Sequence, residues 1–131
     1  MSMIPVTCAI ILHGGRVLAT QRSERMHLPL KWEFPGGKVH EGESEEDCIV
    51  REIREELGIH IELVQRLAPA EWDYGTFAIR LIPFIARYTG GTIQLAEHRD
   101  AQWLTRNELG TLDWAPADLP ILDELLATSF V

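Results

Sequence analysis

The sequence is poor in cysteine, in basic residues and in long apolar runs, and each shortage excludes a class of protein. Its only cysteines, Cys8 and Cys48, form no C-x-x-C pair and stand among apolar residues, which predicts buried thiols in a reducing cytoplasm rather than a disulfide framework. Twelve Lys and Arg against 20 Asp and Glu give a formal net charge of −8, so polymeric nucleic acid is not an expected partner. The apolar residues 3–12 are too few to span a membrane, lack the marks of a secretory leader and are rich in β-branched residues, so they predict a strand.

The length of 131 residues predicts one domain, residues 1–131, that can fold without a disulfide or a structural metal. Apolar segments separated by turn signals predict strands, and Gly90-Gly91 predicts a hairpin. The strands are expected at residues 4–12, 17–22, 31–34, 59–67, 76–88, 91–95 and 101–104. Helices are expected at residues 45–57 and 118–127, with a short one between Thr105 and Gly110. The predicted fold class is α/β, with a mixed sheet sandwiched between helices.

The helix expected at residues 45–57 has the clearest boundary signals. Ser44 is a suitable N-cap with Asp47 three residues later, and Gly58 follows the last helical residue. An apolar stripe at helical spacing is expected to face the sheet, and three carboxylates lie beside it. The stripe consists of Ile49, Val50, Ile53 and Leu57, and the carboxylates are those of Glu52, Glu55 and Glu56.

The three carboxylates stand at positions i, i+3 and i+4, so they project from one side of a single helical turn. Such a cluster repels itself unless cations neutralise it, which favours a site for hard divalent ions such as Mg²⁺ or Mn²⁺. Arg51 stands one turn before Glu55 and can offset part of the repulsion. A turn at Pro35-Gly36-Gly37 would let the backbone approach a ligand. The alternative interpretation is a solvated acidic helix face.

Residues 37–59 match the pattern G-x5-E-x7-R-E-U-x-E-E-x-G-U, with U a bulky aliphatic residue, at every defined position. In this pattern the sequence resembles the Nudix hydrolase superfamily, and more narrowly the MutT-type nucleoside triphosphate pyrophosphohydrolases. Further similarity lies at Gln21-Arg22, in residues 32–38, at Glu97 and in residues 115–118. The resemblance implies a Nudix-type α/β/α sandwich with one catalytic helix and a C-terminal helix. It also implies Mg²⁺-dependent hydrolysis, with Mn²⁺ as substitute, of a nucleoside triphosphate to nucleoside monophosphate and pyrophosphate.

The resemblance also implies roles for individual residues in and near the pattern of residues 37–59. Glu55, Glu56 and the Gly37 carbonyl would bind metal, and Glu52 would be either a ligand or the base that activates water. Arg51 would orient Glu52. Glu97 would be a ligand or the base, although its neighbours His98, Arg99 and Asp100 compete for that assignment. Lys38 and Arg22 would contact phosphate or nucleotide, with solvated surface charges as the alternative.

The base pocket implied by the resemblance consists of Arg22, Glu33, Phe34, the region from Tyr74 to Phe77, and Asp118. MutT proteins specific for 8-oxoguanine carry Asn where this chain has Asp118. An ionised carboxylate only accepts hydrogen bonds, so Asp118 is expected to prefer a base edge with amino donors, such as that of cytosine or adenine. Asp118 is also a plausible helix N-cap, and the two roles are compatible.

These residues predict a small-molecule nucleotide as substrate, a cytosine or modified nucleoside triphosphate above all, and neither a membrane nor a nucleic-acid polymer as partner. The alternatives are an 8-oxo-dGTP hydrolase, a Nudix hydrolase of another nucleoside diphosphate derivative, and a non-catalytic nucleotide-binding module. Either a monomer or a homodimer is compatible with the sequence. The five histidines show no zinc-binding spacing.

Overall fold

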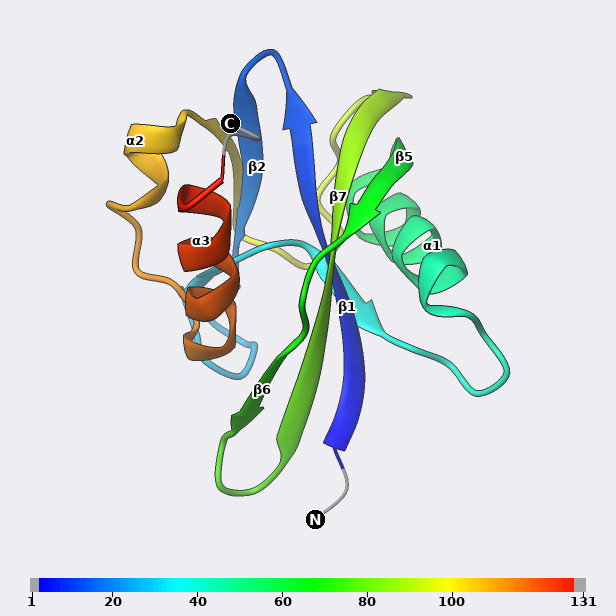
Figure 1. Cartoon of the computed structure of the whole chain (residues 1–131), viewed down its shortest axis with the longest axis vertical. Helices are drawn as coiled ribbons and strands as arrows, with labels where there is room; N and C mark the ends of the chain where they lie inside the picture. Colours follow the sequence, from blue (N-terminus) through cyan, green and yellow to red (C-terminus); the bar gives the residue numbers. More distant parts are fainter. Residues whose placement is uncertain (1–2, 129–131) are drawn as a thin grey trace.

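The computed structural model describes residues 3–128 and contains one mixed sheet with helices on both of its faces (Figure 1). The strands are β1 (Met3–His13), β2 (Arg16–Gln21), β3 (Trp32–Glu33), β4 (Gly36–Lys38), β5 (Ile59–Arg66), β6 (Ala70–Asp73), β7 (Ala78–Gly91) and β8 (Asp100–Leu104). The helices are α1 (Glu45–Leu57), α2 (Arg106–Leu109), the 3-10 turn η1 (Pro116–Asp118) and α3 (Leu119–Leu126).

Two long strands, β1 and β7, form the centre of the sheet and run parallel to each other from Met3↔Ala78 to Leu12↔Arg87. The strands that flank this pair are antiparallel to it, with β2 and β4 on β1 and with β5 and β6 on β7. Strands β3 and β8 both pair with β2. A sheet with both kinds of pairing confirms the predicted mixed sheet.

The two faces of the sheet carry separate cores because successive side chains of a strand point to opposite faces. In β1, Ala9 and Ile11 belong to the core under α1, whereas Cys8 and Ile10 belong to the core on the opposite face. Figure 1 shows α1 on one side of the sheet and α2 and α3 on the other. The expected α/β/α sandwich is therefore confirmed.

Helix α1 begins and ends where its local signals predict. The Ser44 hydroxyl accepts a hydrogen bond from the Asp47 backbone N–H at 3.0 Å, and Gly58 closes the helix with a φ of 71°. That left-handed conformation costs glycine little because it has no Cβ. Val50 is the member of the predicted stripe that stays exposed, and Cys48 is buried on this side of the helix instead.

Several strand predictions near glycines and prolines are wrong. Residues 92–95 are not a strand, and Gly90-Gly91 does not form a hairpin turn, because both glycines continue β7 opposite His60 and Ile59 of β5 with a local register shift. Residues 36–38 form β4 rather than a turn. Strand β6 was not expected. The C-terminal helix expected at residues 118–127 is confirmed as α3, and the 3-10 turn η1 precedes it.

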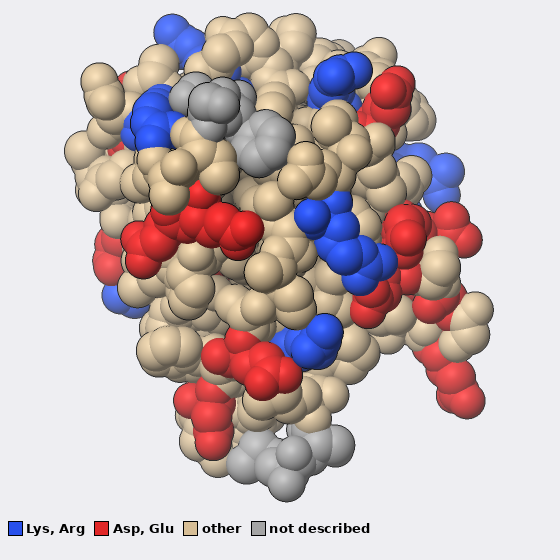
Figure 2. Space-filling model, viewed as in Figure 1, with Lys and Arg blue, Asp and Glu red and all other residues tan. Residues whose placement is uncertain are grey.

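The surface is acidic but not uniformly so. On the face shown in Figure 2, basic side chains are scattered among acidic ones, in keeping with the net charge of −8. Among the helices of residues 3–128, none has the length and apolar character that crossing a membrane requires.

Candidate active site

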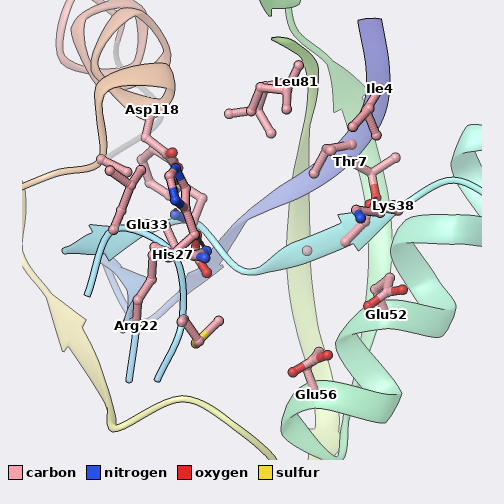
Figure 3. A pocket seen from close by; sticks show the side chains of 18 of the residues that line it. Ile4, Thr7, Arg22, His27, Glu33, Lys38, Glu52, Glu56, Leu81 and Asp118 are labelled. Carbon is pink, nitrogen blue, oxygen red and sulfur yellow. Dashed lines mark hydrogen bonds and ion pairs between the residues drawn. The ribbon is translucent and has the colours of Figure 1, made fainter. Parts of the chain in front are cut away.

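Helix α1 contributes two carboxylates to a pocket of about 800 Å³, a volume typical of small-ligand sites. Glu52 and Glu56 stand one helical turn apart, and Figure 3 shows both side chains on the side of α1 that faces the cavity. Glu52 is 8% exposed despite its charge, because the fully buried Ile49 and Ile53 hold this part of α1 against the sheet. The acidic helix face is therefore part of a cavity and not simply a solvated surface.

Arg51 neutralises the acidic side of α1. Its guanidinium donates hydrogen bonds to Glu43 at 2.6 and 2.9 Å, to Glu52 Oε1 at 2.8 Å and to Glu55 Oε2 at 3.0 Å. The hydrogen bonds from Arg51 lower the pKa of Glu43 to about 2. The carboxylate of Glu55 is 56% exposed and does not belong to the described pocket lining. The structure thus brings Glu52 and Glu56 together at the pocket and leaves Glu55 outside it, bound to Arg51.

Gly37 lies where a side chain would collide with Glu52. A Cβ on Gly37 would stand 2.2 Å from Glu52 Cδ, so a side chain at this position would displace the Glu52 carboxylate. The Gly37 carbonyl accepts a hydrogen bond from Thr7 Oγ1 at 3.2 Å. Gly37, Glu52 and Glu56 all line the same pocket, so a backbone strand and a helix supply oxygen atoms at one end of it.

Glu56 fits a divalent cation for two reasons. Its Oε2 is buried and has no hydrogen-bond partner in the described chain, and desolvation by burial raises its pKa. A hard cation would relieve both penalties, because carboxylate oxygens are preferred ligands of Mg²⁺ and Mn²⁺. Within residues 3–128 no three His, Cys, Asp or Glu side chains are already gathered around one ion position. Mg²⁺ usually binds one or two protein carboxylates and completes its shell with waters and substrate phosphates.

A polar chain of three side chains begins at the opposite end of the pocket and leads back towards Glu56. Arg22 Nη1 donates to Glu33 Oε1 at 2.8 Å, and Glu33 Oε2 lies 2.8 Å from His98 Nε2. Figure 3 shows Arg22, Glu33 and Asp118 together across the cavity from Glu52 and Glu56. The strands β2 and β3 set this arrangement, since Thr20 pairs with Glu33 in the sheet.

Asp118 is a pocket residue whose side chain does not cap a helix. It occupies the N-cap position of α3, but its side chain makes no capping hydrogen bond there. Its Oδ2 instead accepts a hydrogen bond from the Phe34 backbone N–H at 2.9 Å. Asp118 is 5% exposed, and burial, followed by the charge of Glu33, raises its pKa well above the usual value. The expected capping role is therefore wrong, and the side chain faces the pocket.

Aromatic side chains form an apolar wall near this polar chain. The rings of Tyr74 and Phe77 lie 5.3 Å apart, and His27 contacts both at 5.5 and 5.2 Å. All three line the pocket. Ring faces and edges of this kind can pack on a nucleobase. Phe34 is only 2% exposed and packs on Trp114 at 4.7 Å.

Lys38 and Glu97 also line the pocket, and both side chains belong to exposed residues. The pocket therefore gathers every predicted site residue except Arg51, which holds Glu52 from outside the lining, and Glu55. The predicted residues that it gathers are Arg22, Glu33, Phe34, Gly37, Lys38, Glu52, Glu56, Tyr74, Phe77, Glu97 and Asp118.

Three histidines, His27, His40 and His98, line the pocket and were not found from the sequence, and His27 and His98 contact predicted site residues. His27 comes from the loop after β2, and His98 from the connection between β7 and β8. Neither has a spacing that signals a metal or catalytic site, and both reach the pocket through tertiary contacts. The run of polar residues around Glu97 marked the right segment for His98 without distinguishing it from its neighbours.

Comparison with known proteins agrees with this geometry. Residues 1–125 match the family model of the NUDIX domain. The chain is 36% identical to the CTP pyrophosphohydrolase of Escherichia coli K12, over 97% of this chain and 94% of that protein. It is 30% identical to the 8-oxo-dGTP diphosphatase of the same strain, over 95% and 98%. Among solved structures, the MutT protein of methicillin-resistant Staphylococcus aureus 252, a Nudix hydrolase, is 40% identical with a TM-score of 0.78, over 96% and 97%.

Proposed function

Because the chain belongs to the Nudix hydrolase family, we propose that it hydrolyses a cytosine or modified nucleoside triphosphate to the monophosphate and pyrophosphate with Mg²⁺, or with Mn²⁺ as a substitute. The observation that carries this proposal is the single pocket that joins two chemically different ends. One end offers Glu52 and Glu56 for a cation, and the other offers Asp118 and an aromatic wall for a base. A nucleoside triphosphate has two corresponding parts, phosphates that would bind the cation and a base that would lie at Asp118 and the aromatic wall.

The residues of the matched pattern have different roles at the cation end of the pocket, the end that contains Glu52 and Glu56. Glu52, Glu56 and the Gly37 carbonyl would hold the divalent cation, with Glu55 available as a further ligand if it leaves Arg51. When bound, the cation would neutralise phosphate charge and favour deprotonation of the attacking water. Arg51 fixes the Glu52 carboxylate through the 2.8 Å hydrogen bond.

Three further residues, Lys38, Arg22 and Glu97, complete the assignment. Lys38 would contact the phosphates, and Arg22 the nucleotide. Glu52 and Glu97, which both line the pocket, are the two candidates for the general base.

Asp118 supports cytosine as the base. When ionised, its carboxylate accepts hydrogen bonds only, and cytosine presents an amino donor at N4. Tyr74 and Phe77 lie beside the same part of the pocket and would pack on the ring. The 36% identity to a protein named CTP pyrophosphohydrolase agrees with this preference.

The raised pKa of Asp118 favours a second candidate, 8-oxo-dGTP. A protonated carboxyl group donates one hydrogen bond and accepts another, as the Asn of 8-oxoguanine-specific MutT proteins does. A neutral Asp118 would therefore accept the oxidised purine that an ionised Asp118 rejects. The 30% identity to an 8-oxo-dGTP diphosphatase is in keeping with this candidate.

The first test is pyrophosphate release with Mg²⁺ at pH ~8.5, where a carboxylate base is ionised. The panel contains CTP, dCTP, 5-methyl-dCTP, 8-oxo-dGTP, dGTP, dATP and 2-hydroxy-dATP, ranked by kcat/KM. We expect a cytosine nucleotide to lead by about tenfold or more. A lead by 8-oxo-dGTP would overturn the assignment of the base while keeping the reaction.

The matched variants are Glu56→Gln and Glu46→Gln, which remove the same charge from the same helix. Glu46 is exposed and pairs with Arg66 away from the pocket. Glu56→Gln should lower kcat/KM by about 10³-fold or more, because a lost metal contact costs several kcal/mol of transition-state stabilisation, and Glu46→Gln should leave it unchanged. If Glu56→Gln turned over substrate at the wild-type rate, the proposed metal-dependent hydrolysis would be wrong. Sugar phosphate among the products would point to a nucleotide sugar, and binding without turnover to a non-catalytic module.

We also propose that residues 1–131 act as one domain on small nucleotides in the cytoplasm. The buried free thiols of Cys8 and Cys48 are in keeping with a reducing compartment. A monomer and a homodimer both satisfy this proposal.

A further inference from the structure

His98 is a buried imidazole that lies between the two ends of the pocket. Its side chain is 2% exposed, with Nε2 2.8 Å from Glu33 Oε2 and Nδ1 3.8 Å from Glu56 Oε2. Glu33 belongs to the base end and Glu56 to the cation end. One rigid ring therefore faces both a carboxylate that contacts Arg22 and a carboxylate suited to a cation.

The nitrogen of His98 that faces Glu56 and the Glu56 oxygen that faces it both lack a hydrogen-bond partner. His98 Nδ1 and Glu56 Oε2 are buried and have no hydrogen bond within the described residues. Unpaired buried polar atoms are costly, and a separation of 3.8 Å exceeds hydrogen-bond length by less than about 1 Å. An ionised Glu33 only accepts, so Nε2 carries the hydrogen and Nδ1 of a neutral ring is an acceptor. Nδ1 and Glu56 Oε2 therefore face each other as two acceptors, which a cation or a donor lying beside both would satisfy.

The backbone fixes where this ring stands. The connection that carries His98 is attached to the end of α1 by Gln94 N–H to Leu57 O at 2.8 Å and Ala96 N–H to Glu56 O at 3.2 Å. On the other side of His98, Arg99 N–H donates to Gln21 O of β2 at 2.9 Å. The segment thus joins α1 to β2, and the His98 imidazole lies between these two elements.

We propose that His98 is a positioning residue for both ends of the pocket, with Nε2 fixing Glu33 at the base end and Nδ1 assisting cation binding at Glu56. Partners of a metal-ligating residue that lie outside the coordination shell commonly change metal affinity by 10- to 100-fold. This inference rests on the proposed function, since it assumes a nucleotide whose base and phosphates occupy the two ends.

The test separates the two nitrogens with His98→Asn and His98→Gln. The side-chain amide of Asn reaches the position of Nδ1, and that of Gln reaches the position of Nε2, so each variant keeps a polar group at one of the two positions. Mn²⁺ affinity is measured by electron paramagnetic resonance on the protein without nucleotide. Base discrimination is measured as the ratio of kcat/KM between the preferred and the second-ranked nucleotide. His60→Ala is the control, because His60 is an exposed histidine of β5 outside the described lining of the pocket.

We expect His98→Gln to weaken Mn²⁺ binding about tenfold while it keeps the discrimination ratio. His98→Asn should keep Mn²⁺ affinity and lower the ratio about fivefold or more, a step we scale to one lost hydrogen bond. His98→Ala should show both losses. His60→Ala should show neither.

Equal losses in the Asn and Gln variants, or wild-type values in both, would overturn the positioning role at the two ends and leave His98 a structural residue. If His98→Ala fails to fold, as judged by thermal unfolding, the Asn and Gln pair still decides. If the wild-type enzyme cleaves no nucleoside triphosphate, the proposed function fails. In that case Mn²⁺ binding that is weakened in Gln but not in Asn still supports the contact between His98 and Glu56, and unchanged binding contradicts it.

Discussion

Asp118 combines a nearly complete loss of solvent with a nearby negative charge. It is 5% exposed, one oxygen accepts from the Phe34 N–H, and Glu33 lies close enough to raise its pKa further. In the unfolded chain the carboxyl group ionises near its usual pKa of about 3.9. Because the folded pKa is higher, the unfolded state loses its proton first, and stability falls as the pH rises past about 4.

The substitution Asp118→Asn should therefore stabilise the protein at neutral pH. The Asn side chain cannot ionise, can still accept from Phe34 and ends the repulsion with Glu33. We expect the free energy of unfolding to rise by about 1 kcal/mol or more at pH 7, since one pKa unit corresponds to about 1.4 kcal/mol. Urea unfolding at pH 3.5 and pH 7 measures this gain, which should shrink at the lower pH. Asp123→Asn, at an exposed position of α3, is the control, and a gain independent of pH would refute the argument.

Helix α1 carries Glu52 and Glu56, so the residues that cap this helix also stabilise the site. Ser44→Ala removes the acceptor of the Asp47 N–H and should lower the free energy of unfolding by about 1 kcal/mol. Ser44→Asp should retain most of the stability, because its carboxylate also accepts this bond and suits the helix N-terminus. Urea titration with an unchanged m-value provides the comparison. The idea fails if the Ala variant is as stable as the wild type.

Local signals explain why α1 was predictable and other elements were not. Its caps, stripe and carboxylates all lie within residues 44–58, so one window contains the whole signal. Gly90 and Gly91 carry the same local signal as a hairpin, yet they lie in a strand, because pairing with His60 and Ile59 accommodates them as an irregularity. His98 becomes a pocket residue only through contacts with Glu33 and Glu56, which lie 65 and 42 positions away. Such placements depend on the assembled sheet.

At the scale of the molecule, acidic residues outnumber basic ones, and the pocket contains further carboxylates that are partly or fully buried. The formal charge is −8, and within the pocket Glu56 holds a raised pKa because of its desolvation. A cation that binds only the folded chain stabilises it by mass action, by about 2.7 kcal/mol at 100 times its dissociation constant. Glu52 and Glu56 come together only when α1 is helical, and Gly37 joins them only when β4 packs against α1, so the unfolded chain lacks this site.

Mn²⁺ should therefore raise the unfolding temperature of the whole protein, and EDTA should reverse the rise. For a domain of this size a gain of about 2.7 kcal/mol corresponds to an increase of roughly 5–15 °C. Differential scanning calorimetry in Mn²⁺, at an ionic strength held constant with NaCl, separates site binding from general screening of the acidic surface. Glu56→Gln should lose most of the increase and Glu46→Gln should keep it. If both variants respond like the wild type, the cation acts on the overall charge of the molecule and not on the end of the pocket formed by α1 and β4.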